Sequence, residues 1–204
     1  MGSNALHPTK QTLIDTVVSL MDSHPAAEIN SDEVLEISGI SKGSLYHHFE
    51  DFPELIEHAM VARFARFVDN SVMMLNDVIT KAKSRDDLVA GLKRVTRATQ
   101  APELTAHRSE RVVAIAKAIR LPRMQARLGE EQERLTLALA DLFRESVERG
   151  WGDPKMDPRV VGVMVQAYTI GKIVDDITPT RMDAEKWNEA IDAVLEKVFF
   201  SQGA

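Results

Sequence analysis

The chain has 204 residues, of which 44% are hydrophobic and 27% charged, and its formal net charge at pH 7 is −6. These values are ordinary for a globular protein and allow one good-sized domain or two small ones. The absence of cysteine excludes a disulfide framework, a thiol nucleophile and a cysteine-ligated zinc site. No apolar run reaches the roughly 18 residues of a membrane span, and no signal peptide is evident, so we expect a cytoplasmic protein without a membrane partner.

The charge is unevenly distributed along the chain. Residues 1–55 contain two basic side chains, Lys10 and Lys42, against nine acidic ones, which gives this segment a formal charge of −7. The remaining residues are nearly neutral, with 23 basic and 22 acidic side chains. Because a DNA-binding segment must attract phosphates, this acidity counts against nucleic-acid binding by the N-terminal region.

The first expected helix covers residues 9–23, where apolar residues recur at helical spacing. Leu13 and Val17 lie on one stripe of this helix. His24 is followed by Pro25, and a residue before proline disfavours helical backbone, so the helix is expected to end there.

Two short helices with a tight turn between them are expected next. The first spans residues 31–38, with Ser31 or Asp32 as its N-cap. Gly39 permits the left-handed backbone of a sharp turn, and Ser41 is the expected N-cap of the following helix. This layout is typical of a helix-turn-helix.

The rest of the chain is predicted to be helical, without strand-like alternation. Asp51 and Pro53 mark the start of a long fourth helix that runs to about residue 82. Glycines and prolines then form a loop at 150–158. The other helices are expected at about 85–100, 103–120, 122–149, 158–177 and 183–200.

The helix predicted at 158–177 is apolar around nearly its whole circumference. Such a helix must be buried on all sides, either in the centre of a monomer or between its own core and a second subunit. Gly162, Ala167 and Gly171 would permit close helix approach. Together with the helix at 183–200, it is the predicted homodimer interface, since helix-turn-helix proteins usually bind DNA as two-fold dimers.

The helix after the turn has distinct inward and outward faces at 100° per residue. Leu45 and Phe49 face inward, with Val34, Ile37 and Ile40 as expected neighbours. The opposite side carries small and hydrogen-bonding side chains suited to the major groove of DNA. The candidate DNA-binding residues are Lys42, Gly43, Ser44, Tyr46, His47 and His48. Protonation of the two histidines below about pH 6.5 would strengthen phosphate contact.

Residues 40–49, Ile-Ser-Lys-Gly-Ser-Leu-Tyr-His-His-Phe, resemble the recognition-helix signature of the TetR family of bacterial transcriptional regulators. The close motif covers roughly residues 30–55, and the helical layout extends the likeness over the chain. The resemblance implies an all-α fold of about nine helices. It also implies a helix-turn-helix domain at 1–52 that reads a palindromic operator in double-stranded DNA, and a ligand-binding and dimerisation domain at 53–204.

The chain departs from the family pattern at three positions. Phe52 stands where the family usually has a phosphate-contacting lysine. Lys10 stands near the position of a common arginine in the first helix, and Leu35 replaces a usual alanine. Together with the charge of −7, these departures predict weak non-specific binding with a shallow salt dependence, so that DNA binding depends on a good operator and low ionic strength.

The family resemblance also implies a small-molecule effector whose binding releases the protein from DNA, with repression as the usual mode. Its pocket should be apolar with few polar anchors. The candidate lining residues are Phe64, Phe67, Met74, Phe143, Gln166, Tyr168 and Thr169. Each aromatic or methionine at helical spacing is more often a core residue. His107 and Arg111 could receive an anionic ligand, although solvated side chains are the simpler interpretation.

An enzyme is the first competing interpretation. Glu54 and His58 could share a metal on one helix face, but no third ligand is evident and a surface pair is the simpler interpretation. Asp175 and Asp176 lack a further carboxylate at helical spacing. Neither a catalytic triad nor a phosphate-binding glycine loop is present, so no enzyme, metal or cofactor is predicted. The second competitor is a helical dimeric interaction protein that has lost strong DNA binding.

Overall fold

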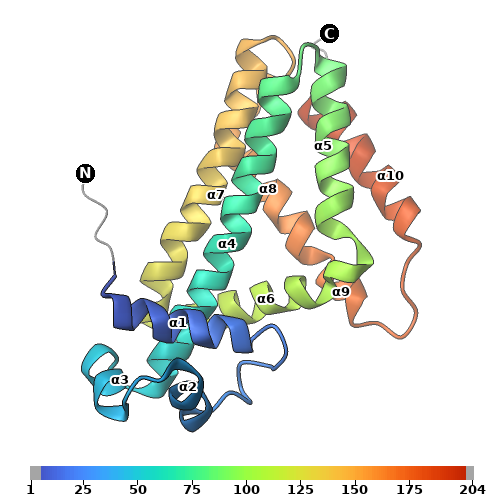
Figure 1. The fold of residues 1–204 in the computed structure, drawn as a ribbon. Helices are drawn as coiled ribbons and strands as arrows, with labels where there is room; N and C mark the ends of the chain where they lie inside the picture. The colour runs from blue at the N-terminus through green and yellow to red at the C-terminus, as the bar shows by residue number, and fades with distance from the viewer. Residues whose placement is uncertain (1–5, 201–204) are drawn as a thin grey trace. The chain divides into compact units, whose positions relative to one another are not determined.

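The computed structural model describes residues 6–200, and every regular element within them is helical, which confirms the predicted all-α class (Figure 1). A short 3₁₀ helix, Pro102–Leu104, and a π-helical turn, Leu195–Phe199, supplement the α-helices. The α-helices are α1 (Pro8–Leu20), α2 (Ser31–Ser38), α3 (Lys42–His48), α4 (Phe52–Lys81), α5 (Arg85–Gln100), α6 (Thr105–Arg120), α7 (Pro122–Glu148), α8 (Pro158–Gly171), α9 (Ile173–Asp176) and α10 (Ala184–Val194).

The described residues form two compact units. The first contains the chain up to Arg66 together with Lys117–Leu128, and the second contains Phe67–Ala116 and the residues from Gly129 onward. Helices α4, α6 and α7 each contribute residues to both units. The functional boundary at residues 52 and 53 remains a prediction. None of the helices in the part of the chain that the structure describes is long and apolar enough to cross a membrane.

The N-terminal helices of the first unit are defined by their caps and by a small core. Asn30 caps α2, because its Oδ1 accepts a hydrogen bond from the Glu33 backbone N–H at 3.0 Å. The prediction of Ser31 or Asp32 as this cap was therefore wrong by one or two positions. An asparagine in extended backbone just before the helix performs the same task.

The core of this unit confirms most of the predicted inward positions. Leu13, Val17, Val34, Leu45 and Phe49 are all buried. Ile37 is the exception and remains 59% exposed. The buried arc of α2 is centred between Val34 and Leu35, and at 100° per residue Ile37 lies about 110° away from that centre.

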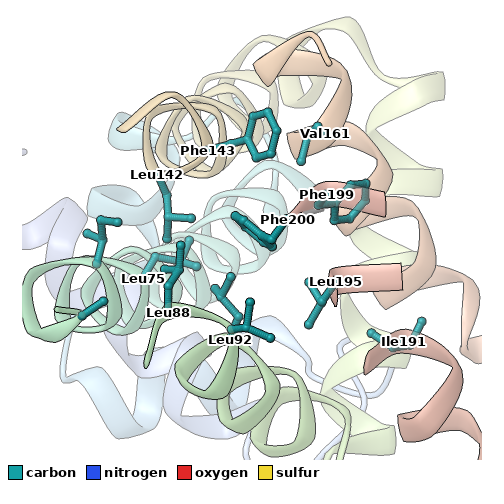
Figure 2. Close-up of a cluster of buried hydrophobic side chains, with 13 residues drawn as sticks. Leu75, Leu88, Leu92, Leu142, Phe143, Val161, Ile191, Leu195, Phe199 and Phe200 are labelled. Atoms are coloured by element: carbon teal, nitrogen blue, oxygen red, sulfur yellow. The ribbon is translucent and has the colours of Figure 1, made fainter. Parts of the chain in front are cut away.

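The core of the second unit gathers apolar side chains from α4, α5, α7, α8 and the C-terminal segment. Figure 2 shows Phe143 of α7 near Val161 and the C-terminal pair Phe199 and Phe200, with the ring centroids of Phe143 and Phe200 5.8 Å apart. Gly162 brings α8 close to α7, since a Cβ there would lie 3.0 Å from the Thr136 carbonyl oxygen. The close approach predicted at Gly162 is therefore made within one chain.

The last predicted helices are interrupted. The helix expected at 158–177 breaks around Lys172, so that α8 ends at Gly171 and the four-residue α9 follows. The break places Asp176 in the interior, where it pairs with Arg108 and Lys172. The helix expected at 183–200 ends as α10 at Val194 and continues as the π-helical turn.

Candidate functional site

The turn between α2 and α3 has the geometry expected of a helix-turn-helix. Gly39 ends α2 with φ of 66°, and its N–H donates to the Leu35 carbonyl oxygen at 3.0 Å. Ser41 then caps α3, with its Oγ accepting from the Ser44 backbone N–H at 3.2 Å. Leu45 is fully buried, so α3 is held on the core by one side and presents the other to solvent.

The solvent-facing side of α3 carries four of the predicted DNA-binding residues. Lys42, Gly43, Tyr46 and His47 are exposed. A Cβ at Gly43 would meet nothing closer than 4.0 Å, so its backbone is open to close approach by another molecule. Ser44 is half-buried. Its hydroxyl oxygen accepts a hydrogen bond from the Ser41 hydroxyl at 3.3 Å, and the Ser44 O–H remains able to donate.

His48, the sixth predicted residue, is half-buried among other basic groups. Its ring centroid lies 4.7 Å from that of His7 and 5.1 Å from that of His47. Loss of solvent, followed by repulsion from His7, His47 and Lys10, lowers the pKa of His48. In the free protein, His48 therefore gains its charge only in more acidic solution than an unperturbed histidine would require. Lys10 itself lies 4.9 Å from the centroid of the Phe49 ring.

The candidate metal pair at the start of α4 is part of an ion-pair network. His58 Nε2 lies 3.7 Å from Glu54 Oε1 and 2.8 Å from Arg127 Nη1. Burial and the Arg127 charge lower the pKa of His58 to about 4. Glu57 is buried against Arg123 and Arg127. The Glu54 and His58 side chains are mostly buried, not on the surface as the sequence suggested, because α7 residues cover them.

No group of three or more histidine, aspartate or glutamate side chains that could hold a metal ion is found among residues 6–200. The Asp175 carboxylate accepts from the Met182 backbone N–H at 3.0 Å. Its neighbour Asp176 is engaged by Arg108 and Lys172. Phe52, where the family usually has a lysine, is half-buried at the first residue of α4.

The first three effector candidates lie along α4. Phe64 is buried in the first unit. Phe67 and Met74 are half-buried in the second unit. The Arg111 guanidinium stands over the Phe67 ring, 3.9 Å from its centroid.

The remaining effector candidates belong to the interior of the second unit. Gln166 is buried and donates to Thr136 Oγ1 at 2.9 Å. The Thr169 hydroxyl donates to the Val165 carbonyl oxygen at 2.7 Å, so it is used within α8. Burial raises the pKa of Tyr168 despite an opposing hydrogen bond with Thr96. Phe143 packs in the core cluster of Figure 2.

Arg108 and Arg111 of α6 form a buried cationic cluster with Lys172, and the sequence analysis did not predict this cluster. His107 is exposed as expected, but Arg111 is only 8% exposed, so the prediction of a solvated Arg111 was wrong. The missed signal is its spacing, because Arg108 and Arg111 continue the helical stripe of Ala114 and Ala118, both of which are buried.

One face of α8 and α9 remains uncovered in the single chain. Its exposed members share helical spacing: Val160, Val163, Met164, Ala167, Gly171 and Val174. A Cβ at Gly171 would meet nothing within 4 Å. Contiguous exposed apolar surface of this kind is typical of interaction sites.

Comparisons with known proteins address the fold directly. No family model matches the chain. The nucleoid occlusion factor SlmA of Alteromonas mediterranea is 23% identical over 190 residues, which cover 87% of this chain and 89% of that protein. A Mesorhizobium loti protein described as a TetR-family transcriptional regulator aligns with a TM-score of 0.70 at 18% identity, over 95% of this chain and 97% of that chain.

A transcriptional regulator of the TetR/AcrR family from Thermobifida fusca aligns with a TM-score of 0.62 at 16% identity, over 93% of this chain and 97% of that chain. The alignments extend over nearly all of this chain, so the likeness is not limited to the helix-turn-helix. The resemblance indicated by residues 40–49 is confirmed, and the chain has the fold of the TetR family of transcriptional regulators.

Proposed function

We propose that the protein is a ligand-responsive transcriptional regulator that binds double-stranded DNA through α3. The observation that carries the proposal is the exposed face of α3, held outward by the Gly39 turn and the Ser41 cap. In the bound state this helix lies in the major groove. Lys42, Gly43, Ser44, Tyr46, His47 and His48 contact base edges or phosphates.

The regulator acts as a homodimer on a palindromic operator. The uncovered face of α8, which includes Val163 and Met164, supports a second copy as the partner, and α10 completes the interface. Two α3 helices related by a two-fold axis must match half-sites spaced one helical turn of DNA, about 34–36 Å. An effector that changes this spacing therefore releases the operator. Repression is the corresponding mode of action.

The effector is a small molecule bound in the second part of the chain, beyond residue 52. The half-buried side chains of Phe67 and Met74 on α4 support a partly apolar binding region, and Phe64 belongs to the same helix. From α7 and α8, the proposed contacts are Phe143, Gln166, Tyr168 and Thr169. The hydrogen bonds that occupy Gln166 and Thr169 make these two the weaker members of the set.

Selection of binding sequences from random duplex DNA tests the DNA-binding proposal. The purified protein should enrich a palindrome at low salt, and Lys42→Ala or His47→Ala should reduce the enrichment. The acidic N-terminal segment and Phe52 predict few phosphate contacts, hence a plot of log affinity against log salt with a shallow slope. A steep slope, as in a strongly basic DNA-binding protein, would contradict the assigned contacts.

The charge of −7 in residues 1–55 favours one alternative, a dimeric interaction protein with weak or lost DNA binding. This alternative retains the dimer interface on α8 but has no operator. Failure to enrich any palindrome at low salt, while the protein remains folded and dimeric, would establish the alternative over the regulator.

A further inference from the structure

Arg111 on α6 is a buried cation that forms no ion pair with any residue of the described part of the chain. Its residue is 8% exposed, and its Nε atom makes no hydrogen bond within the described part of the chain. Its guanidinium is stacked over Phe67 at 3.9 Å from the ring centroid, which covers one face of the plane. Stacking orients the guanidinium but gives its buried Nε–H no acceptor.

The charges around Arg111 do not balance. Arg108, one turn earlier on α6, forms an ion pair with Asp176 at 2.8 Å, and Lys172 reaches the same carboxylate at 3.1 Å. This cluster therefore holds three cations against one carboxylate. Burial, and then repulsion from Arg108, lower the pKa of Arg111 to about 10, so it stays charged at neutral pH.

Gln100 supplies a second unpaired donor beside this cluster. The side chain is buried, and its Oε1 accepts a hydrogen bond from Trp187 Nε1. Because the indole N–H can only donate, the amide orientation is determined, and Nε2 is left without a partner among the described residues. The next residue, Ala101, accepts from Arg108 Nη1 at 3.0 Å, so Gln100 adjoins the cationic cluster along the chain.

We propose that Arg111 anchors an anionic small molecule, a carboxylate, as the effector of this protein; the effector role rests on the proposed function. Both unpaired groups are donors, so they require oxygen acceptors. The planar guanidinium matches a carboxylate in two parallel hydrogen bonds. A monoanion also reduces the unbalanced positive charge of the cluster, and an apolar body would lie against the Phe67 side of the site.

Calorimetric titration of the full-length protein tests this site. The probes are straight-chain carboxylates from acetate to dodecanoate and benzoate, each compared with its uncharged amide at constant ionic strength. At least one carboxylate should bind and raise the Tm, whereas its amide should bind at least 10-fold more weakly. Arg111→Met should weaken carboxylate binding at least 10-fold, and Arg111→Lys should restore part of it.

Arg144→Met is the matched control, because Arg144 is an exposed arginine of the same unit that pairs with Asp141. It should bind the carboxylate as the wild type does. Unliganded Arg111→Met should unfold at the wild-type temperature or above, since it removes an unpaired buried charge. Binding of none of the carboxylates, equal binding of acid and amide, or a Tm loss in Arg111→Met as large as in Arg108→Met would each overturn the proposal.

The same samples separate this inference from the proposed function. If a carboxylate binds through Arg111 but operator affinity does not change, the anion site stands and its effector role is wrong. If no operator is selected while carboxylate binding still depends on Arg111, the regulatory function fails and the site stands.

Discussion

Asp176→Asn is the substitution for which the structure makes the largest stability prediction. Asp176 Oδ2 accepts from Arg108 Nε at 2.8 Å, and Oδ1 accepts from Arg108 Nη2 and Lys172 Nζ, each at 3.1 Å. The side chains of Asp176 and Arg108 are 2% and 0% exposed. Asparagine keeps the shape but removes the charge, which leaves buried cations without compensation.

Breaking a buried ion pair by removing one partner costs about 3–5 kcal/mol. For a chain of 204 residues, roughly 2–4 °C of Tm corresponds to each kcal/mol, so the expected fall in Tm is roughly 6–20 °C. Burial alone would raise the pKa of Asp176, but hydrogen bonds from Arg108 and Lys172 outweigh it and lower the pKa. The stabilisation is therefore fully present above the unfolded pKa of about 3.9 and is lost as the pH falls through the lower folded value.

Urea unfolding at equal protein concentration, from pH 7 down to pH 4, measures the difference. The difference in free energy of unfolding between the wild type and Asp176→Asn should stay constant over this pH range. Asp141→Asn is the control, because Asp141 forms an exposed pair with Arg144 and should cost no more than about 1 kcal/mol. If the two variants lose equally little stability, the Asp176 cluster does not hold the second unit together and the reasoning is refuted.

Three further predictions concern the first unit and the α8 face. Val163→Glu should give a monomer in analytical ultracentrifugation. Val113→Glu is the control and should leave the dimer intact, because Val113 is 55% exposed and Val163 is 52% exposed. A dimer in both variants would place the interface elsewhere. Leu45→Ala should lower the free energy of unfolding by about 2–5 kcal/mol and abolish operator binding, measured by urea unfolding and fluorescence anisotropy. The free energy of unfolding of His58→Gln should rise by about 2 kcal/mol relative to that of the wild type as the pH falls from 6.5 to 4, because unfolding lets His58 of the wild type take up a proton. A difference between the two proteins that does not change with pH would refute the lowered pKa of His58.

The fold of the first unit was predictable because its signals are local. Gly39, Ser41 and Asp51 each act within four residues of their own position, so turn chemistry alone placed α3 and the start of α4. The cap of α2 was missed by one or two positions because asparagine, serine and aspartate have similar cap preferences. Ile37 was misplaced because the sequence does not reveal where the centre of a buried arc lies on a two-turn helix.

The interior of the second unit was less predictable because its determinants are distant in sequence. Asp176 and Arg108 are 68 residues apart, and nothing local to either indicates the pair. The helix breaks directly after Gly171, a residue that the sequence marked as a point of close helix approach and not as a helix end. The four-residue α9 was therefore predicted as a continuation of α8.

Arg108 and Arg111 both violate the rule that arginines face solvent, but for different physical reasons. The Arg108 guanidinium donates two hydrogen bonds to the Asp176 carboxylate, so the fold itself explains its burial. Arg111 has an aromatic face but no carboxylate partner among the described residues, and a buried charge without compensation is costly unless another molecule supplies the missing group. Arg108→Met should thus destabilise the protein, whereas Arg111→Met should leave its stability unchanged or increase it. Equal destabilisation at both positions would assign the two arginines to one structural network and remove the reason for a ligand.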